Sequence, residues 1–182
     1  MSADNPWKTL SRRTVYDNPW IRVEDHVVVN PSGRQGQYGK ICFKSQAVVI
    51  AAVERGSIYL VGQHRYTLGA YSWELPKGAA PFGEDVLEAA QRELREETGL
   101  TAKRWRQLLR VHISNSVTDE VGTLFLAEDL VQGPAEPDET EQLAIKKVPF
   151  EECVAWVRAG TITDVVSVTA ILQLAHERLA GR

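Results

Sequence analysis

The sequence predicts an α/β fold preceded by an antiparallel β arm. Residues 84–98 are rich in Ala, Leu, Glu and Arg, which favour an α-helix. Residues 46–63 contain two apolar runs around a Glu-Arg-Gly turn, the pattern of a hairpin in a central sheet. Residues 21–43 hold two more strand-like runs around a Pro-Ser-Gly turn. We therefore expect two domains, the β arm over residues 1–44 and a larger domain over residues 45–182.

Turn and capping residues separate the predicted strands and helices. In the β arm they are a strand at 15–16, a turn at 17–19, a strand at 21–30, a turn at 31–33 and a strand at 38–43. In the larger domain they are strands at 46–53 and 57–63, the helix ending at Gly99, and strands at 106–113, 121–127 and 143–148. A short helix at 150–158 follows Pro149, and Asp164 is placed to cap a terminal helix. The apolar stripe of that last helix is predicted to be Val168, Ile171, Leu172, Ala175 and Leu179.

Composition excludes several classes of protein. The 182 residues carry a net charge of -3 without a large basic patch, so we expect no long nucleic acid as a partner. No stretch has the length of a membrane span, and the first residues lack the apolar core of a secretory leader. Cys42 and Cys153 have no ligand spacing and are predicted to be free, buried thiols in a reducing cytoplasm.

The predicted helix at 84–98 contains the candidate metal-binding residues. Residues three and four apart share a helix face, so Glu93, Glu96 and Glu97 are expected to converge on one side. Such carboxylates repel one another unless a hard divalent cation neutralises them, which indicates Mg²⁺, with Mn²⁺ as the alternative. Glu88, Arg92 and Arg95 are expected to pair with one another on the remaining side, beyond the apolar stripe of Leu87, Ala90 and Leu94. If the Glu/Arg run stood alone, a charged helix exposed to solvent would be the simpler interpretation.

The spacing around these glutamates is more specific than the run itself. Gly78, Glu84, the triplet Arg92-Glu93-Leu94, the pair Glu96-Glu97 and the pair Gly99-Leu100 occupy the fixed positions of one motif. The stretch 78–100 resembles the box of the Nudix hydrolases. The resemblance implies a mixed sheet between helices and hydrolysis of a nucleoside diphosphate linked to a further group. It also implies Glu93, Glu96, Glu97 and the carbonyl of Lys77 as metal ligands, with Glu96 and Arg92 in the catalytic set.

The flanking sequence is similar to the branch that acts on ADP-ribose and nucleotide sugars. Its Gln-x-Arg matches Gln63 and Arg65, which implies that Arg65 contacts substrate phosphate, although a surface ion pair is the alternative. Trp20 is expected either to lie against the base or to be buried under the β arm. Glu120, which ends the loop after residue 113, is assigned to substrate binding.

Two loops complete the interpretation. The branch uses a glutamate in the loop before the strand at 143–148 as general base. Glu139 matches that position, with Glu141 and Glu136 as alternatives. From composition alone, a solvated acidic loop is the simpler interpretation of this segment. Ser114-Asn115-Ser116 replaces the Ser-Pro-Gly typical of ADP-ribose hydrolases, which leaves room for other nucleoside diphosphate sugars. The resemblance further implies a homodimer formed through the β arm and a small nucleotide-sugar substrate. The alternatives are another nucleoside diphosphate derivative (a dinucleoside polyphosphate, coenzyme A or a modified nucleotide) and a non-catalytic nucleotide-sugar sensor on the same fold.

Overall fold

The computed structural model describes residues 4–133 and 143–181. The three candidate bases, Glu136, Glu139 and Glu141, lie outside these residues. The chain divides into two compact units, one made of the β arm with the segment His112–Glu120 and one made of the rest.

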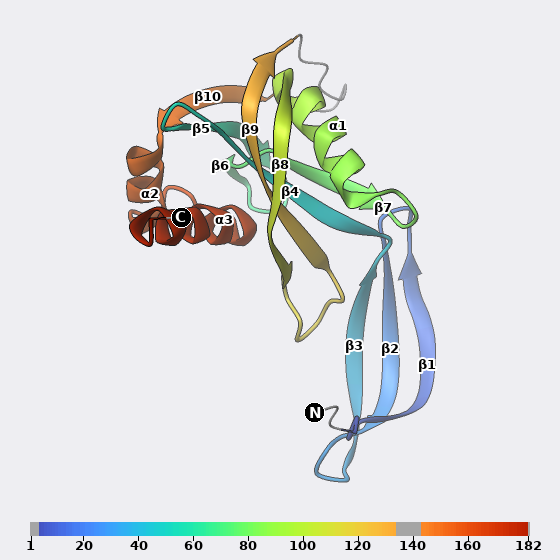
Figure 1. The fold of residues 1–182 in the computed structure, drawn as a ribbon. Helices are drawn as coiled ribbons and strands as arrows, with labels where there is room; N and C mark the ends of the chain where they lie inside the picture. The colour runs from blue at the N-terminus through green and yellow to red at the C-terminus, as the bar shows by residue number, and fades with distance from the viewer. Residues whose placement is uncertain (1–3, 134–142, 182) are drawn as a thin grey trace. The chain divides into compact units, whose positions relative to one another are not determined.

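The β arm is a three-stranded antiparallel sheet in the order β1-β2-β3 (Figure 1). Its strands are β1 (Lys8–Asp17), β2 (Ile21–Val29) and β3 (Gln35–Phe43). The β2–β3 hairpin pairs Ile21 with Phe43 and turns at Gly33, whose φ of 82° favours glycine. The strand predicted at 15–16 is the end of the ten-residue β1, which is exposed along its whole length. Because β1 buries neither face, its sequence lacks the alternation that identifies a half-buried strand.

The segment His112–Glu120 packs with the β arm. The amide of Ile41 donates to the carbonyl of Val117 at 2.9 Å, and the amide of Asp119 donates to the carbonyl of Ile41 at 3.2 Å. Lys40 pairs with the Asp119 carboxylate at 2.8 Å. The segment that carries Asn115-Ser116 is therefore fixed to β3 by backbone bonds, which the sequence did not indicate.

The second unit is built on a seven-stranded sheet. Its strands are β4 (Ser45–Glu54), β5 (Ser57–Arg65), β6 (Ala70–Glu74), β7 (Lys77–Pro81), β8 (Leu100–His112), β9 (Val121–Gln132) and β10 (Ala144–Pro149). The order is β10-β5-β4-β9-β8, with β6 beside β5 and β7 beside β4. Strands β4 and β9 run parallel, while β5 runs antiparallel to β4, β6 and β10, so the predicted mixed sheet is confirmed.

Helices cover both faces of this sheet. Helix α1 (Val86–Thr98) lies on one face, and α2 (Phe150–Arg158) and α3 (Val165–Leu179) lie on the other (Figure 1). Alternate residues of β4, such as Val48 and Ile50, join Ala90 and Leu94 of α1 in one fully buried cluster. Each large apolar side chain buried in this way contributes roughly 1.5–3 kcal/mol, which is what fixes α1 on the sheet.

The buried face of α3 differs from the predicted stripe. It consists of Val166, Ser167, Ala170, Ile171 and Leu174. Ile171 of the predicted stripe is buried, but Leu172 is 43% exposed and Leu179 is 89% exposed, so the prediction was wrong for these two residues. Apolar residues lie on more than one side of this helix, and packing at its first turn, where Ser167 is fully buried, selects the face.

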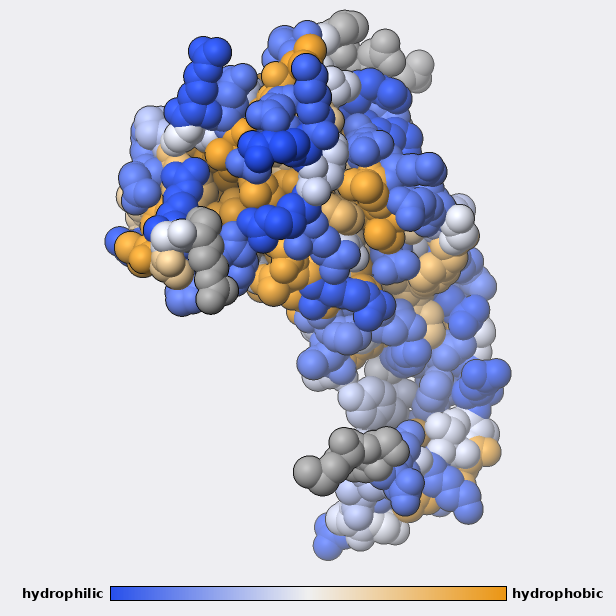
Figure 2. Space-filling view, viewed as in Figure 1, coloured by the Kyte–Doolittle hydropathy of each residue, from blue (hydrophilic) through white to orange (hydrophobic). Residues whose placement is uncertain are grey.

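The visible surface mixes polar side chains with small apolar patches (Figure 2). Within the described ranges, α1, α2 and α3 all lack the length and apolar character needed to cross a bilayer. Cys42 and Cys153 are both free and buried, as predicted.

Candidate active site

Helix α1 begins and ends where local sequence places it. The Asp85 carboxylate accepts hydrogen bonds from the amides of Leu87 and Glu88 at 2.9 and 3.1 Å. Gly99 adopts a left-handed φ of 71° and its amide donates to the carbonyl of Arg95 at 2.8 Å. Burial of one apolar stripe then fixes the rotation of the helix, so that the glutamates of the box lie along its edge.

Two of these glutamates meet the backbone of β7. The amide of Ala79 donates to Glu93 Oε1 at 3.2 Å, and the amide of Lys77 donates to Glu97 Oε2 at 3.0 Å. A β-carbon on Gly78, between them, would lie 2.0 Å from the carboxyl carbon of Glu93. Only glycine permits this approach, so the first residue of the box motif makes room for its central carboxylate.

Arg92 joins this cluster and does not pair with Glu88. Its Nη1 donates to Glu93 at 2.8 Å and to Glu96 at 3.1 Å, and its Nη2 donates to the carbonyl of Ala79 at 2.9 Å. Glu84 completes the contacts of the guanidinium at 3.3 Å. The prediction that Arg92 pairs with Glu88 was wrong, because the long side chain reaches the denser negative charge on the other flank. Burial opposes the charge of Arg92, but these carboxylates outweigh burial and raise its pKa.

The carboxylate oxygens of this cluster are the kind of ligand that a hard cation prefers. Burial raises the pKa of Glu93, which means that its negative charge is only partly compensated by Arg92. In the described part of the chain, however, no group of three acidic, histidine or cysteine side chains is arranged to hold a metal ion. The expected convergence of three glutamates is therefore incomplete: Glu93 and Glu96 share Arg92, while Glu97 bonds to β7. This open arrangement fits Mg²⁺, which commonly takes one or two carboxylates and completes its shell with substrate phosphate and water.

A buried ion network supports β7 from the side of α3. Glu74, 2% exposed, accepts from Arg65 Nη2 at 2.6 Å and pairs with Lys77 Nζ at 2.9 Å. Lys77 also pairs with Asp164 at 2.5 Å, and Asp164 caps α3 through the amide of Ser167 at 3.0 Å. Burial would raise the pKa of Glu74, but Arg65 and Lys77 lower it to about 2. The sequence indicated Asp164 only as a helix cap, and its link to the box required the tertiary structure.

Arg65 therefore makes an ion pair, and that pair is half-buried. Both Nε and Nη2 bond to Glu74, whereas Nη1 has no hydrogen bond among the described residues. Gln63 lies two residues earlier on the same face of β5, together with Tyr59, which packs against the α1 cluster. The Gln63 amide nitrogen is the single buried side-chain nitrogen or oxygen in the described ranges that has no hydrogen-bond partner. A buried donor of this kind indicates a missing acceptor on the α1 face of β5.

The remaining predicted site residues lie elsewhere. Trp20 belongs to the β arm and is 72% exposed, so the alternative of a buried strand tryptophan was wrong. Glu120 ends the segment that packs on β3, where its carbonyl accepts from the amide of Ile113 at 3.2 Å. The structure thus brings together Glu93, Glu96, Glu97, Arg92 and Lys77, and it connects Arg65 to Lys77 through Glu74.

Comparison with known proteins identifies the family of the chain. A model of the NUDIX domain matches residues 44–165, and a model of the nucleoside diphosphate sugar hydrolase N-terminal domain matches residues 7–41. Because the first match spans well over half of the chain, the protein belongs to the Nudix family, and it is a pyrophosphohydrolase of that family.

Individual relatives resemble the chain over nearly its whole length. An ADP-ribose pyrophosphatase of Bacillus subtilis (strain 168) is 29% identical over 169 residues, which cover 92% of this chain and 91% of the relative. An ADP-ribose pyrophosphatase of Mycobacterium tuberculosis is 28% identical over 173 residues, covering 93% of this chain and 84% of the relative. A crystal structure of an ADP compounds hydrolase has a TM-score of 0.87 at 24% identity and covers 100% of this chain and 98% of its own, which shows the same fold.

Proposed function

We propose that the enzyme hydrolyses the pyrophosphate of nucleoside diphosphate sugars such as ADP-ribose, giving a nucleoside monophosphate and a sugar phosphate. The observation that carries the proposal is the β arm, which matches a domain described for nucleoside diphosphate sugar hydrolases and precedes a Nudix domain. The names of the two bacterial relatives support ADP-ribose as a substrate. The segment Ser114-Asn115-Ser116 supports a wider choice of distal sugar.

Glu93, Glu96, Glu97 and the Lys77 carbonyl are the proposed ligands of a divalent cation, Mg²⁺ or alternatively Mn²⁺. When bound, the cation would neutralise the pyrophosphate and lower the pKa of the attacking water. The support is that Glu93 and Glu97 are held by the amides of β7, so they are oriented before any substrate binds. Arg92 holds Glu93 and Glu96 in place and balances their charge until the cation arrives.

Substrate contacts are proposed on the α1 face of β5. The Nη1 of Arg65 and the amide nitrogen of Gln63 are donors without partners in the described residues, and pyrophosphate oxygens are strong acceptors. Glu74 holds the Arg65 guanidinium in one orientation, which lowers the entropy lost when phosphate binds. Glu139, with Glu141 and Glu136 as alternatives, is proposed to take the proton of the water.

The β arm is proposed to form a homodimer and to contact the nucleoside. Its edge strand β1 is exposed throughout, and Trp7, Leu10, Val15, Tyr16 and Trp20 are exposed apolar side chains of the arm. Trp20 is the ring assigned to the base, and Glu120 is assigned to the substrate. We place the enzyme in the cytoplasm because its two thiols are free.

The test is to incubate the enzyme with ADP-ribose, ADP-glucose, GDP-mannose and ATP, each with Mg²⁺ and each with EDTA, and to separate the products. A nucleoside monophosphate and a sugar phosphate, formed only with Mg²⁺, are the expected products. Release of pyrophosphate from ATP alone would assign the enzyme to a different substrate class. Binding of ADP-ribose without turnover would make the protein a sensor.

The dimer has a separate test. Light scattering at micromolar concentration should give twice the mass of one chain. Replacing Tyr16 and Trp20 with serine should shift the protein towards the monomer, whereas replacing the exposed Leu179 of α3 should not. A monomeric wild-type protein would exclude the dimer and leave the hydrolysis test unaffected.

A further inference from the structure

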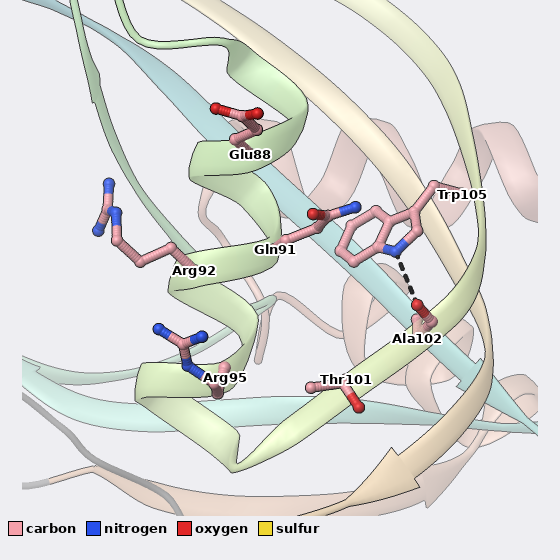
Figure 3. A pocket seen from close by; sticks show the side chains of 7 residues that line it. All are labelled: Glu88, Gln91, Arg92, Arg95, Thr101, Ala102 and Trp105. Carbon is pink, nitrogen blue, oxygen red and sulfur yellow. Dashed lines mark hydrogen bonds between the residues drawn. The ribbon is translucent and has the colours of Figure 1, made fainter.

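A cavity of about 310 Å³ lies between helix α1 and strand β8 (Figure 3). Its walls are Glu88, Gln91, Arg92 and Arg95 of α1 and Thr101, Ala102 and Trp105 of β8. Gln91, Arg92 and Arg95 lie three, four and seven residues after Glu88 and share its helix face, while Glu93 and Glu97 project from another. The cavity therefore stands beside the candidate active site, with Arg92 as the wall between them. Its size lies at the lower end of the range for small-molecule pockets.

Three polar side chains in this cavity differ from Arg92 in their contacts. Among the described residues, Glu88, Gln91 and Arg95 make no side-chain hydrogen bond or ion pair. Arg92, in contrast, is held by three carboxylates and the Ala79 carbonyl, so it does not compete for a ligand. The cavity thus combines one available cation, one available carboxamide and one available carboxylate.

Trp105 supplies an apolar surface. Its indole nitrogen donates to the carbonyl of Ala102 at 3.1 Å, so the polar edge of the ring is satisfied within β8 (Figure 3). The ring packs edge-on against Phe125, with centroids 6.2 Å apart, which holds it in one orientation. Figure 3 shows the Gln91 side chain directed towards this ring. A planar heterocycle placed here could stack on the indole and bond to the carboxamide together.

The positions of the charges set the length of the ligand. Glu88 and Arg95 are seven residues apart, about 10 Å along the helix axis, with Gln91 between them. A ligand must therefore be elongated, with a donor at one end and an anion at the other. A carboxamide pairs in bidentate fashion with the amino group and N7 of adenine, and a guanidinium pairs with phosphate.

We propose that this cavity is a second nucleotide site, which binds an adenosine monophosphate-type ligand. The adenine stacks on Trp105, Gln91 and Glu88 accept from its amino group, Gln91 also donates to N7, and Arg95 binds the phosphate. The ligand class follows from these side chains alone and does not depend on the proposed hydrolysis. Because Arg92 borders the cavity and also bonds to Glu93 and Glu96, a bound nucleotide would lie one side chain from the catalytic carboxylates.

The experiment is a titration of the metal-free protein with adenosine monophosphate, followed through the indole resonances of its five tryptophans. Trp105→Leu identifies the Trp105 signal. That signal should shift on titration. In the Arg95→Gln variant, the dissociation constant of adenosine monophosphate measured from the Trp105 signal should rise at least tenfold. Ribose 5-phosphate and adenosine should each bind at least tenfold more weakly than the monophosphate, and guanosine monophosphate should also bind more weakly. Arg104→Gln, on the same strand but paired with Asp129, should bind as the wild type does.

The proposal fails if adenosine monophosphate leaves the Trp105 signal unchanged, or if Arg95→Gln binds as tightly as the wild type. It also fails if ribose 5-phosphate binds equally well, which would reduce the cavity to a phosphate site. Arg95→Gln should retain wild-type hydrolysis, because Arg95 contacts none of the catalytic groups. A shifted Trp105 signal in a protein that hydrolyses none of the nucleotide sugars would overturn the proposed function and leave this site intact.

Discussion

Gly78 lies so close to Glu93 that a β-carbon on the glycine would meet the carboxyl carbon at 2.0 Å. The two residues begin and centre the box motif, fifteen positions apart in the sequence. Their contact lets the amides of β7 reach the carboxylates of α1. The spacing of these two motif positions thus corresponds to a steric requirement between a strand and a helix.

The Gly78→Ala variant should lose most of its activity. The added methyl group must displace Glu93 or separate β7 from α1, which costs about 1–3 kcal/mol of stability. We expect hydrolysis to fall at least a hundredfold and the melting temperature to fall by several degrees. Gly39→Ala is the matched control, because nothing lies within 4 Å of its added carbon. Normal activity in Gly78→Ala would show that the close approach is unimportant.

The Glu93→Gln and Glu97→Gln variants should remain folded with hydrolysis reduced at least a hundredfold. Each change keeps the size of the side chain and removes one charge from the proposed cation site. Glu88→Gln, on the exposed side of the same helix, should be active. Calorimetric titration with Mg²⁺ provides the independent reading: if either variant kept full activity and Mg²⁺ affinity, that glutamate would not be a ligand.

The Glu139→Gln variant should have a kcat at least a hundredfold lower, with little change in KM. A general base acts in the transition state and contributes little to ground-state binding. Steady-state kinetics of Glu136→Gln and Glu141→Gln should be close to the wild type. An inactive Glu141→Gln beside an active Glu139→Gln would move the base by two residues.

The Gln63→Met variant should be at least as stable as the wild type and should bind substrate more weakly. Methionine fills a similar volume and removes a buried donor that has no partner, which favours the folded state by about 1 kcal/mol. If the amide donates to pyrophosphate, KM should rise about tenfold. Gln107→Met, on the exposed part of β8, should change neither quantity. Greater stability with an unchanged KM would remove Gln63 from the substrate site.

The Glu74→Gln variant should change how stability depends on pH. The pKa of Glu74 is about 2 in the folded protein against an ordinary value of 4.5. A lowered pKa contributes stability above pH 4.5, and that contribution is lost as the pH falls from 4.5 towards 2. The variant should therefore be less stable by about 3 kcal/mol at pH 7, with the difference shrinking below pH 4.5.

Urea unfolding at several pH values between 2 and 7 measures this difference. Asp129→Asn is the control, since its ion pair with Arg104 is largely exposed and should contribute little at any pH. A difference between Glu74→Gln and the wild type that did not vary with pH would mean that the carboxylate is not stabilised by Arg65 and Lys77.

The sequence by itself determined the box helix, its C-terminal end and its family. Gly99 was predicted as the stop, and its amide bonds to the carbonyl of Arg95 within the last turn. The start was predicted at residue 84, two residues too early, because Asp85 is the N-cap and its carboxylate accepts from the amide of Leu87. The apolar runs of β4 and β5 identified the central hairpin for the same local reason. The fixed spacing of the box glutamates predicted that they share one side of the helix, but Glu93 and Glu97 bond to β7, whereas Glu96 bonds to Arg92.

Only the tertiary structure decided which partners those side chains have. Asp164 meets Lys77 from 87 residues away, and Arg92 turns to Glu93 and Glu96 because β7 brings the Ala79 carbonyl to the same place. Ion pairs of this kind depend on which surfaces pack together, and a long side chain can reach several carboxylates. The face of α3 that is buried and the attachment of His112–Glu120 to β3 were settled in the same way, by contacts between segments that are distant in sequence.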